Sequence, residues 1–196
     1  MNLLTAFYKN KGYRDFHFIS DSIEYSEDGE KMNLVLTVDE GPLYKYRNFS
    51  WEGMTLFDQK ILERTLALEK GKKYSDEDFN MAVFSRVQGL YLDRGYIYSK
   101  VEPKITPVEE DSLDIHFVIT ENHQVSINQI SIVGNTRTRE NVIRRQLRVY
   151  PGDIYNQDLI ARSYREIMML NYFANAAPNI IPVSEDKINI EFTAVS

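Results

Sequence analysis

The sequence contains no cysteine, only one tryptophan and only three histidines in 196 residues. The absence of cysteine excludes disulfide bonds, thiolate metal sites and cysteine nucleophiles from this segment. The histidines (His17, His116 and His123) lie far apart and do not form a plausible metal-binding set. No phosphate loop, nucleophile–base pair or carboxylate pair is visible either. We therefore expect no enzyme activity, no metal and no cofactor.

Long apolar runs are also missing: none approaches the roughly 20 residues that a membrane-spanning helix needs. The net charge of −6 argues against general binding of nucleic acid, which requires a basic surface. This charge is uneven, because residues 1–43 and 44–122 carry about −4 and −3 whereas residues 124–196 carry about +1. The last part of the chain is therefore the one that we expect to face an anionic surface.

The dominant feature that is present is an alternating apolar pattern that occurs three times. Its copies are Met32, Leu34, Leu36 and Val38, then Leu113, Ile115, Phe117 and Ile119, and finally Ile188, Ile190, Phe192 and Ala194. Strict alternation is typical of a strand with one buried face. Recurrence at this spacing indicates tandem modules.

Residues 44–122 show the complete repeating unit. An aromatic strand ends at Gly53, a helix with a Thr55–Asp58 capping box follows, and Gly71 ends that helix. A second helix begins at Ser75 and ends before Gly95, with apolar residues at Phe79, Val83, Val87, Leu90 and Tyr91. Two strands complete the unit, at about 96–106 and 113–120.

The sequence therefore predicts an α+β fold of tandem β-α-α-β-β modules, each with two helices packed on a three-stranded sheet. Residues 1–43 form a partial module with only the second helix and the hairpin, and residues 44–122 and 123–196 form complete ones. Short links at 39–42 and 121–124 predict a jointed array. Met1 to Leu4 already read as helix without a signal peptide, so we expect a segment of a longer protein. We expect the partial module to be less ordered, or covered by another chain.

Several local motifs resemble those of one family. They are Val-Gly-Asn at 133–135, Ile-Arg-Arg-Gln-Leu-Arg at 143–148, Gly-Asp at 152–153, and Leu-Asn-Tyr-Phe at 170–173, where Asn171 replaces the family's glycine. With the module order, they resemble the POTRA domains of BamA-type outer-membrane assembly factors. The Tyr-Pro-Gly at 150–152 is most similar to versions from Bacteroidetes-type bacteria.

This resemblance implies an array on the periplasmic face of the outer membrane, leading to a β-barrel after Ser196, with the third module next to the membrane. It implies binding of unfolded outer membrane β-barrel proteins and of accessory assembly lipoproteins, in order to assist folding and insertion. POTRA modules of a two-partner-secretion or TamA-like transporter are the alternative. FtsQ-type division proteins, which carry one such module, fit less well.

A first candidate site consists of exposed strand edges, where an extended client segment can pair with free backbone groups. Prolines and lysines in strand 96–106 protect its edge, whereas strand 13–25 contains no proline. We predict client contacts at Phe16, His17, Phe18, Ile19 and Ser20, and in the second module at Val101 and Ile105. The alternative is that these apolar residues complete a core or a module interface.

A second candidate is the arginine cluster Arg137, Arg139, Arg144, Arg145 and Arg148. Three of these residues (Arg137, Arg144 and Arg148) have helical spacing and are predicted to share a face toward a membrane or an acidic partner. The alternative is a solvated helix face with pairs such as Glu140–Arg144, which stabilise a helix only slightly.

Overall fold

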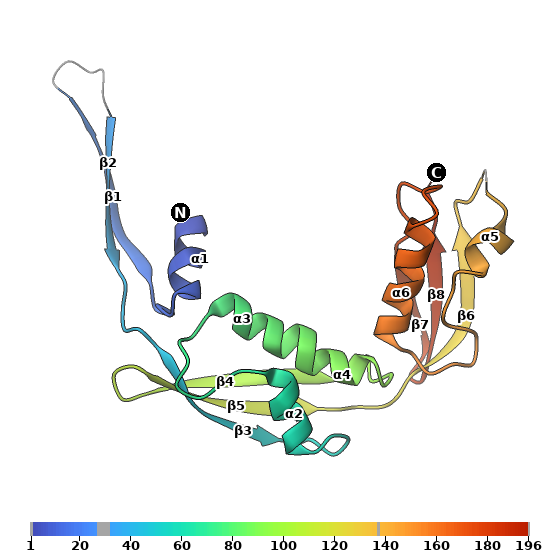
Figure 1. Cartoon of the computed structure of the whole chain (residues 1–196), viewed down its shortest axis with the longest axis horizontal. Coiled ribbons are helices and arrows are strands. Elements are labelled where there is room, and N and C mark those ends of the chain that lie inside the picture. The colour runs from blue at the N-terminus through green and yellow to red at the C-terminus, as the bar shows by residue number, and fades with distance from the viewer. Residues whose placement is uncertain (1, 27–31, 137, 196) are drawn as a thin grey trace. The chain divides into compact units, whose positions relative to one another are not determined.

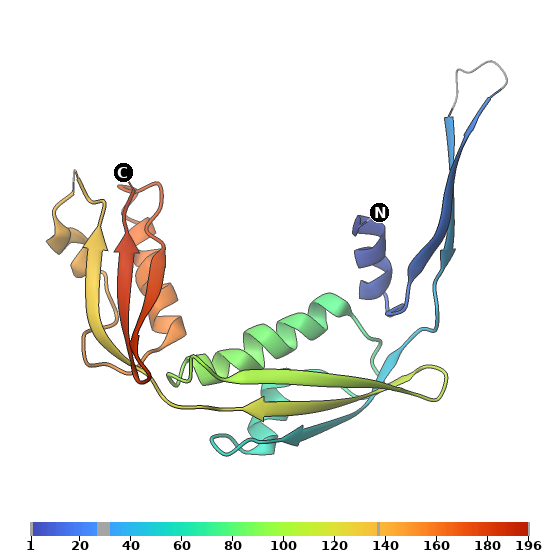
Figure 2. The ribbon, with the colours of Figure 1, turned by 180° about the vertical axis from the view of Figure 1, so that it is seen from behind.

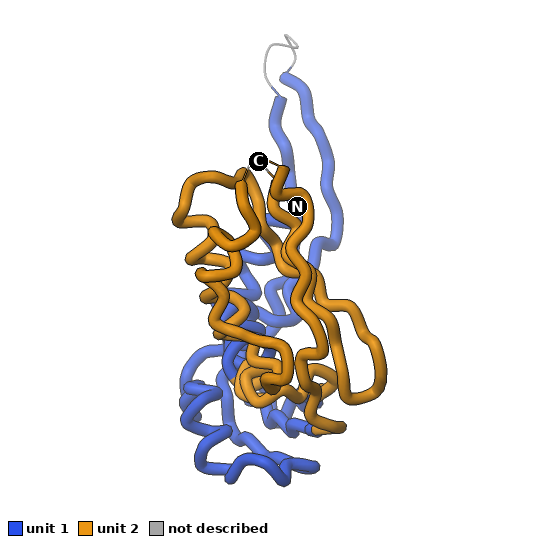
Figure 3. Tube along the Cα trace, turned by 90° about the vertical axis from the view of Figure 1, so that its right-hand side faces the viewer, with its two compact units in different colours: residues 1–86, 101–119 blue, residues 87–100, 120–196 orange. Residues whose placement is uncertain are grey.

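The computed structural model describes residues 2–26, 32–136 and 138–195 (Figure 1). The chain divides into two compact units, residues 1–86 with 101–119 and residues 87–100 with 120–196 (Figure 3). Unit 1 contains the partial first module and most of the second module. Unit 2 contains the end of the second module's last helix and the whole third module.

The first module consists of α1 (Asn2–Asn10), β1 (His17–Tyr25) and β2 (Met32–Asp39). The two strands pair antiparallel from His17 opposite Asp39 to Tyr25 opposite Met32. Their register shifts at Ile19, which forms a bulge between Phe18 and Ser20. The helix and the two hairpin strands predicted for this module are present. Residues 27–31, between the two strands, lie outside the described ranges.

The hairpin of the first module leaves its apolar side chains exposed. Leu34 is 57% exposed, whereas its counterparts Ile115 and Ile190 in the complete modules are exposed by 1% or less. Near the base of the hairpin, Phe16 is buried and stacks on Tyr8 with ring centroids 4.2 Å apart. The part of the hairpin that the structure describes therefore presents an uncovered apolar surface.

The second module contains β3 (Lys45–Glu52), α2 (Gln59–Leu66), α3 (Asp76–Asn80), η1 (Met81–Val87), α4 (Gln88–Leu92), β4 (Lys100–Val108) and β5 (Ser112–Thr120). Its sheet has the order β3-β5-β4, in which β3 pairs parallel with β5. Helices α2 and α3 lie on one face of this sheet (Figure 1). Residues of β5 alternate between buried and half-buried, as the apolar pattern predicts.

The second helix of this module differs from a regular α-helix, because η1 is a π-helical segment between α3 and α4. Its buried residues Phe79, Val83, Val87 and Tyr91 recur every four positions. In an α-helix of 3.6 residues per turn, that spacing drifts around the axis, and the wider i→i+5 turn of a π-helix compensates the drift.

The two helix starts predicted in this module have different outcomes. The Ser75 side chain accepts a hydrogen bond from the Asp78 amide, which confirms the start of the second helix. Helix α2 begins later than the Thr55–Asp58 motif predicts, because Asp58 and not Thr55 is its N-cap. The Asp58 side chain makes no capping bond.

The third module repeats the order with β6 (Ser126–Val133), α5 (Glu140–Arg144), α6 (Gln157–Met168), β7 (Pro178–Ser184) and β8 (Lys187–Thr193). Its sheet order is β6-β8-β7, with β6 parallel and β7 antiparallel to β8 (Figure 2). Strand β8 and helix α6 contribute Ile188, Ile190, Phe192, Ile160 and Ile167 to its core. The predicted α+β fold of helices packed on three-stranded sheets is therefore confirmed.

Both complete modules have a glycine just after the first strand that contacts the end of the last strand. A Cβ atom on Gly53 would lie 2.1 Å from the Ile119 carbonyl oxygen, and one on Gly134 would lie 2.6 Å from that of Ala194. Both glycines have φ of +81°. The closing strand therefore tolerates only glycine at this point.

We expect Gly53→Ala to lower the free energy of unfolding by more than about 3 kcal/mol, because it adds a backbone clash to the left-handed strain. Gly71→Ala is the matched control: Gly71 also has φ of +81°, but its Cβ would meet nothing within 4 Å. The control should cost only the strain of about 1–2 kcal/mol. Urea unfolding of both variants measures the difference, and equal losses would contradict the contact.

Candidate functional site

Free strand edges are the feature that all three modules share. In the complete modules the second strand, β4 or β7, lies at the edge of its sheet, and in the first module β1 pairs with β2 and with no other strand of the described residues. The client-binding prediction requires this edge position. Such edges expose unpaired N–H and C=O groups to any extended segment that approaches.

The predicted residues of the first module lie in different environments. Phe16 is buried and belongs to the small core of this module, and Phe18 is half-buried against it. His17 is exposed, with Nδ1 3.0 Å from the Asp15 carbonyl oxygen. His17, Ile19, which is 62% exposed, and Ser20 are therefore the exposed members of this set.

Beside the β4 edge, unit 1 contains a groove of about 350 Å³. Phe84 of η1 and Pro103 and Ile105 of β4 form an apolar part of its lining. Basic and acidic side chains, Lys9, Arg14, Asp15 and Asp76, also line it. Of the two residues predicted here, Ile105 faces the groove, whereas Val101 is buried in the module.

Sequence reasoning missed Phe84, the exposed aromatic residue of this groove. A signal for it exists, because Phe84 is apolar but out of phase with the buried residues Phe79, Val83 and Val87. An apolar residue on the outer face of a helix is typical of a contact surface when it lies beside others.

The predicted arginine face is not a helix face. Helix α5 ends at Arg144, so helical spacing does not extend to Arg148, which lies in the following segment. Arg144 pairs with Glu140, and Arg148 lies 2.9 Å from Glu166. Glu166 raises the pKa of Arg148 further above its ordinary value.

The two other described arginines of the cluster are not held in ion pairs by the described part of the chain. Arg139 and Arg145 are exposed, and the structure gives neither of them a carboxylate partner among the residues it describes. Arg137 lies outside the described residues. Ion pairing therefore divides the described arginines into two groups. Arg144 and Arg148 are paired with glutamates, whereas Arg139 and Arg145 are exposed.

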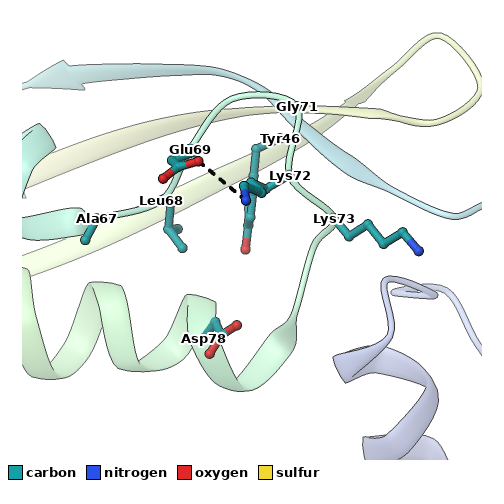
Figure 4. A pocket seen from close by; sticks show the side chains of 8 residues that line it. All are labelled: Tyr46, Ala67, Leu68, Glu69, Gly71, Lys72, Lys73 and Asp78. Carbon is teal, nitrogen blue, oxygen red and sulfur yellow. Dashed lines mark ion pairs between the residues drawn. The ribbon is translucent and has the colours of Figure 1, made fainter.

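A cavity of about 570 Å³ in unit 1 lies between the α2–α3 connection and α3 (Figure 4). Glu69 and Lys72 form an ion pair at 3.7 Å on one side, and Asp78 faces Tyr46 across it. Burial raises the pKa of Tyr46 to about 12, an effect that Asp78 and Asp76 increase and the Ser75 backbone reduces. A general acid or base needs a pKa near the working pH, so this shift runs opposite to what catalysis requires.

Trp51 and His116 both make contacts within the sheet of the second module. Trp51 stacks on Phe117 with ring centroids 4.3 Å apart. His116 bonds Ser50 through Nδ1 and Glu52 through Nε2, at 2.8 and 3.0 Å. Among the described residues, no group of histidine and acidic side chains is arranged to hold a metal ion, and no helix has the length and apolar character needed to cross a membrane.

Repeated β-α-α-β-β modules, with the second strand at the edge of each three-stranded sheet, define a class of tandem α+β repeat domains. The family model named POTRA, described as "Surface antigen variable number repeat", matches residues 44–122 and 125–194. The chain belongs to this POTRA family. Both matched segments coincide with the complete modules of the structure.

The similar proteins include outer membrane protein assembly factors. The chain is 31% identical to BamA of Neisseria meningitidis serogroup B over 98% of its own length and 25% of that protein. It is 27% identical to BamA of Nitratidesulfovibrio vulgaris, over 96% of the chain and 24% of the relative. The chain thus spans about a quarter of the length of these relatives.

Solved structures of BamA have the same fold. Haemophilus influenzae BamA POTRA3-5 superposes with a TM-score of 0.81 at 20% identity, over 97% of this chain and 76% of that one. Haemophilus ducreyi BamA lacking POTRA domains 1-3 gives a TM-score of 0.65 at 16% identity, over 79% of this chain and 29% of that one. These likenesses confirm the tandem POTRA fold.

The raised pKa of Tyr46 gives a testable dependence of stability on pH. The folded state keeps the proton to a higher pH than the unfolded state, so the stabilisation is complete below about pH 10 and is lost as pH rises toward 12. Compared with Tyr46→Phe, the native protein should lose up to about 1.4 kcal/mol more per pH unit in that range. Urea unfolding between pH 8 and pH 11 measures this, and parallel curves for the two proteins would contradict it.

Proposed function

We propose that this chain is the periplasmic POTRA array of an outer-membrane β-barrel assembly factor. It binds unfolded outer membrane β-barrel proteins and assists their folding and insertion. Membership of the POTRA family and similarity to BamA proteins along nearly the whole chain support this proposal. The observation that carries the binding mode is the exposed, proline-free edge of β1.

Backbone pairing suits a protein that handles many different clients. An extended segment that joins a sheet edge pairs through its own N–H and C=O groups, and these groups are common to all sequences. Clients that form β-barrels are rich in segments of this kind. The exposed side chains near the edge then favour apolar clients through surface burial.

Of the three edges, β1 is the one we assign to client binding. Strand β4 carries Pro103 and Pro107, and β7 carries Pro178 and Pro182, which remove backbone donors. The bulge at Ile19 interrupts β1 only near its start, and the paired residues from Ser20 to Tyr25 continue in regular register. Ile105 and the groove beside β4 provide a second, apolar contact for the same client.

We expect a photo-crosslinking residue at Ser20 to capture an unfolded outer membrane β-barrel protein, because Ser20 is exposed at the start of the regular edge. The same probe at Lys104 on the proline-containing β4 is the matched control and should capture at least about fivefold less, the effect of roughly one lost hydrogen bond. The experiment uses the intact chain with the client diluted from urea. Equal capture at both positions, or none at Ser20, would refute the assignment of β1.

The exposed arginines of the third module provide a second contact in this proposal. Arg139 and Arg145 meet the anionic membrane surface or an acidic face of an accessory assembly lipoprotein. The excess positive charge of residues 124–196 supports this orientation. Contacts of this kind steer association and weaken as salt rises.

We expect Arg139→Gln with Arg145→Gln to weaken binding to vesicles containing phosphatidylglycerol, by up to about fivefold per arginine at low salt. The control is Arg144→Gln with Arg148→Gln, which removes the same charge from arginines that are already paired. Co-sedimentation at two salt concentrations provides the measurement. If both double variants lose binding equally, total charge and not the exposed pair is responsible.

A further inference from the structure

The turn that follows the second helix of a module makes the same contacts at two places in the chain. In unit 1, Asn10 Oδ1 accepts a hydrogen bond from the Glu77 amide at 2.9 Å. In unit 2, Asp93 Oδ1 accepts one from the Asp158 amide, also at 2.9 Å. Each acceptor belongs to one module, and each amide belongs to the first turn of the second helix in the next module.

A backbone bond two residues further on is also repeated. The Gly12 carbonyl oxygen accepts from the Tyr44 amide, and the Gly95 carbonyl oxygen accepts from the Val125 amide, both at 2.9 Å. Tyr44 and Val125 each make a second bond within their own module. The Tyr44 carbonyl oxygen accepts from the Tyr74 amide, and the Val125 carbonyl oxygen accepts from the Tyr155 amide, both at 2.9 Å. The two turns therefore join the next module through side chain and backbone alike.

The glycine in each turn is required by the following module as well as by its backbone conformation. Gly12 and Gly95 are buried, with φ of +107° and +84°. A Cβ atom on Gly12 would lie 2.7 Å from Leu43 Cδ1, and one on Gly95 would lie 2.6 Å from Ile154 Cγ2. A larger residue in place of Gly95 would push away Ile154 of the next module, and one in place of Gly12 would push away Leu43, the residue directly before the next module.

We propose that residues 10–12 and 93–95 are docking turns: surfaces that recognise the next POTRA module through a side-chain acceptor at the first position and a glycine at the third. The partner that such a turn fits is the start of a β-α-α-β-β module, where it binds an amide of the second helix and the amide of the residue just before the first strand. Two independent copies with matching atoms and distances carry this inference. It does not depend on client binding.

The third module has a different version of this turn. After α6, Met169 stands at the acceptor position and Asn171 at the glycine position, again with a left-handed φ of +56°. Met169 is 78% exposed, and its side chain has no oxygen that could accept a hydrogen bond from an amide. Asn171 carries the Cβ atom for which the other two turns have no room. Because it has neither the side-chain acceptor at its first position nor the glycine at its third, the turn at 169–171 does not accept a further module of the same kind.

Replacing residues of the turn at 93–95 by those of the turn at 169–171 tests in unit 2 whether the acceptor and the glycine are required. We expect Asp93→Met with Gly95→Asn to speed amide exchange of Asp158 and Val125 by about fivefold or more, since each amide loses a hydrogen bond. The Leu159 amide, bonded to Asn156 within the third module, should keep its rate. Asparagine tolerates the left-handed region, so the turn itself persists.

The matched control for this variant is Arg94→Leu, which transplants only the exposed middle residue and should leave the three exchange rates unchanged. Unchanged rates of Asp158 and Val125 in the transplant variant would overturn the proposal. So would a control variant that releases them as strongly.

A pair of substitutions at the first turn decides the matter independently, even if the transplant disturbs the fold of the third module. Asn10→Asp introduces the residue that the second turn uses, and Asn10→Met introduces that of the third. Exchange of the Glu77 amide should stay within about twofold in the first variant and rise about fivefold or more in the second. The Asp78 amide, capped by Ser75, is the internal reference. Equal effects of aspartate and methionine would show that the side-chain acceptor has no role and overturn the proposal.

Discussion

The position of the last strand in each complete module is the constraint on which the rest of the structure depends. Strand β5 lies between β3 and β4, and β8 lies between β6 and β7. The strand that comes last in the sequence of each module is therefore the central strand of its sheet. Its alternating apolar residues face the helices and form the core. The glycines after the first strands follow from the same constraint, because the end of the central strand approaches them too closely for a side chain.

The first module shows what the central strand requires from its neighbours. Strand β2 has the same alternating pattern as β5 and β8, yet its leucines are largely exposed. Among its described residues, this module has α1 as its helix and neither a parallel first strand nor a covering first helix. Apolar alternation thus specifies which face would be buried, whereas burial itself needs the two elements that cover that face.

Much of this organisation follows from the sequence, because it rests on local patterns. Alternation predicted the closing strands, the spacing of Gly53 and Gly71 predicted the first helix, and Ser75 predicted the start of the second. The π-helical segment, the bulge at Ile19 and the short α5 were missed. Each of them adjusts the backbone to contacts from other elements, so no single stretch of sequence encodes them. For the same reason the edge position of β1 was predictable, whereas the groove at Phe84 became visible only when β4 was placed beside η1.

The parallel pairing of first and last strands has a mechanical consequence. In each complete module the chain enters through one of two neighbouring parallel strands and leaves through the other, β3 with β5 and β6 with β8. Tension applied along the polypeptide pulls these strands in opposite directions and loads their hydrogen bonds together, in shear. In the first module, β1 and β2 form an antiparallel hairpin, whose bonds open one after another when its ends are drawn apart. Under a stretching force the hairpin thus opens at a lower force than the two complete modules.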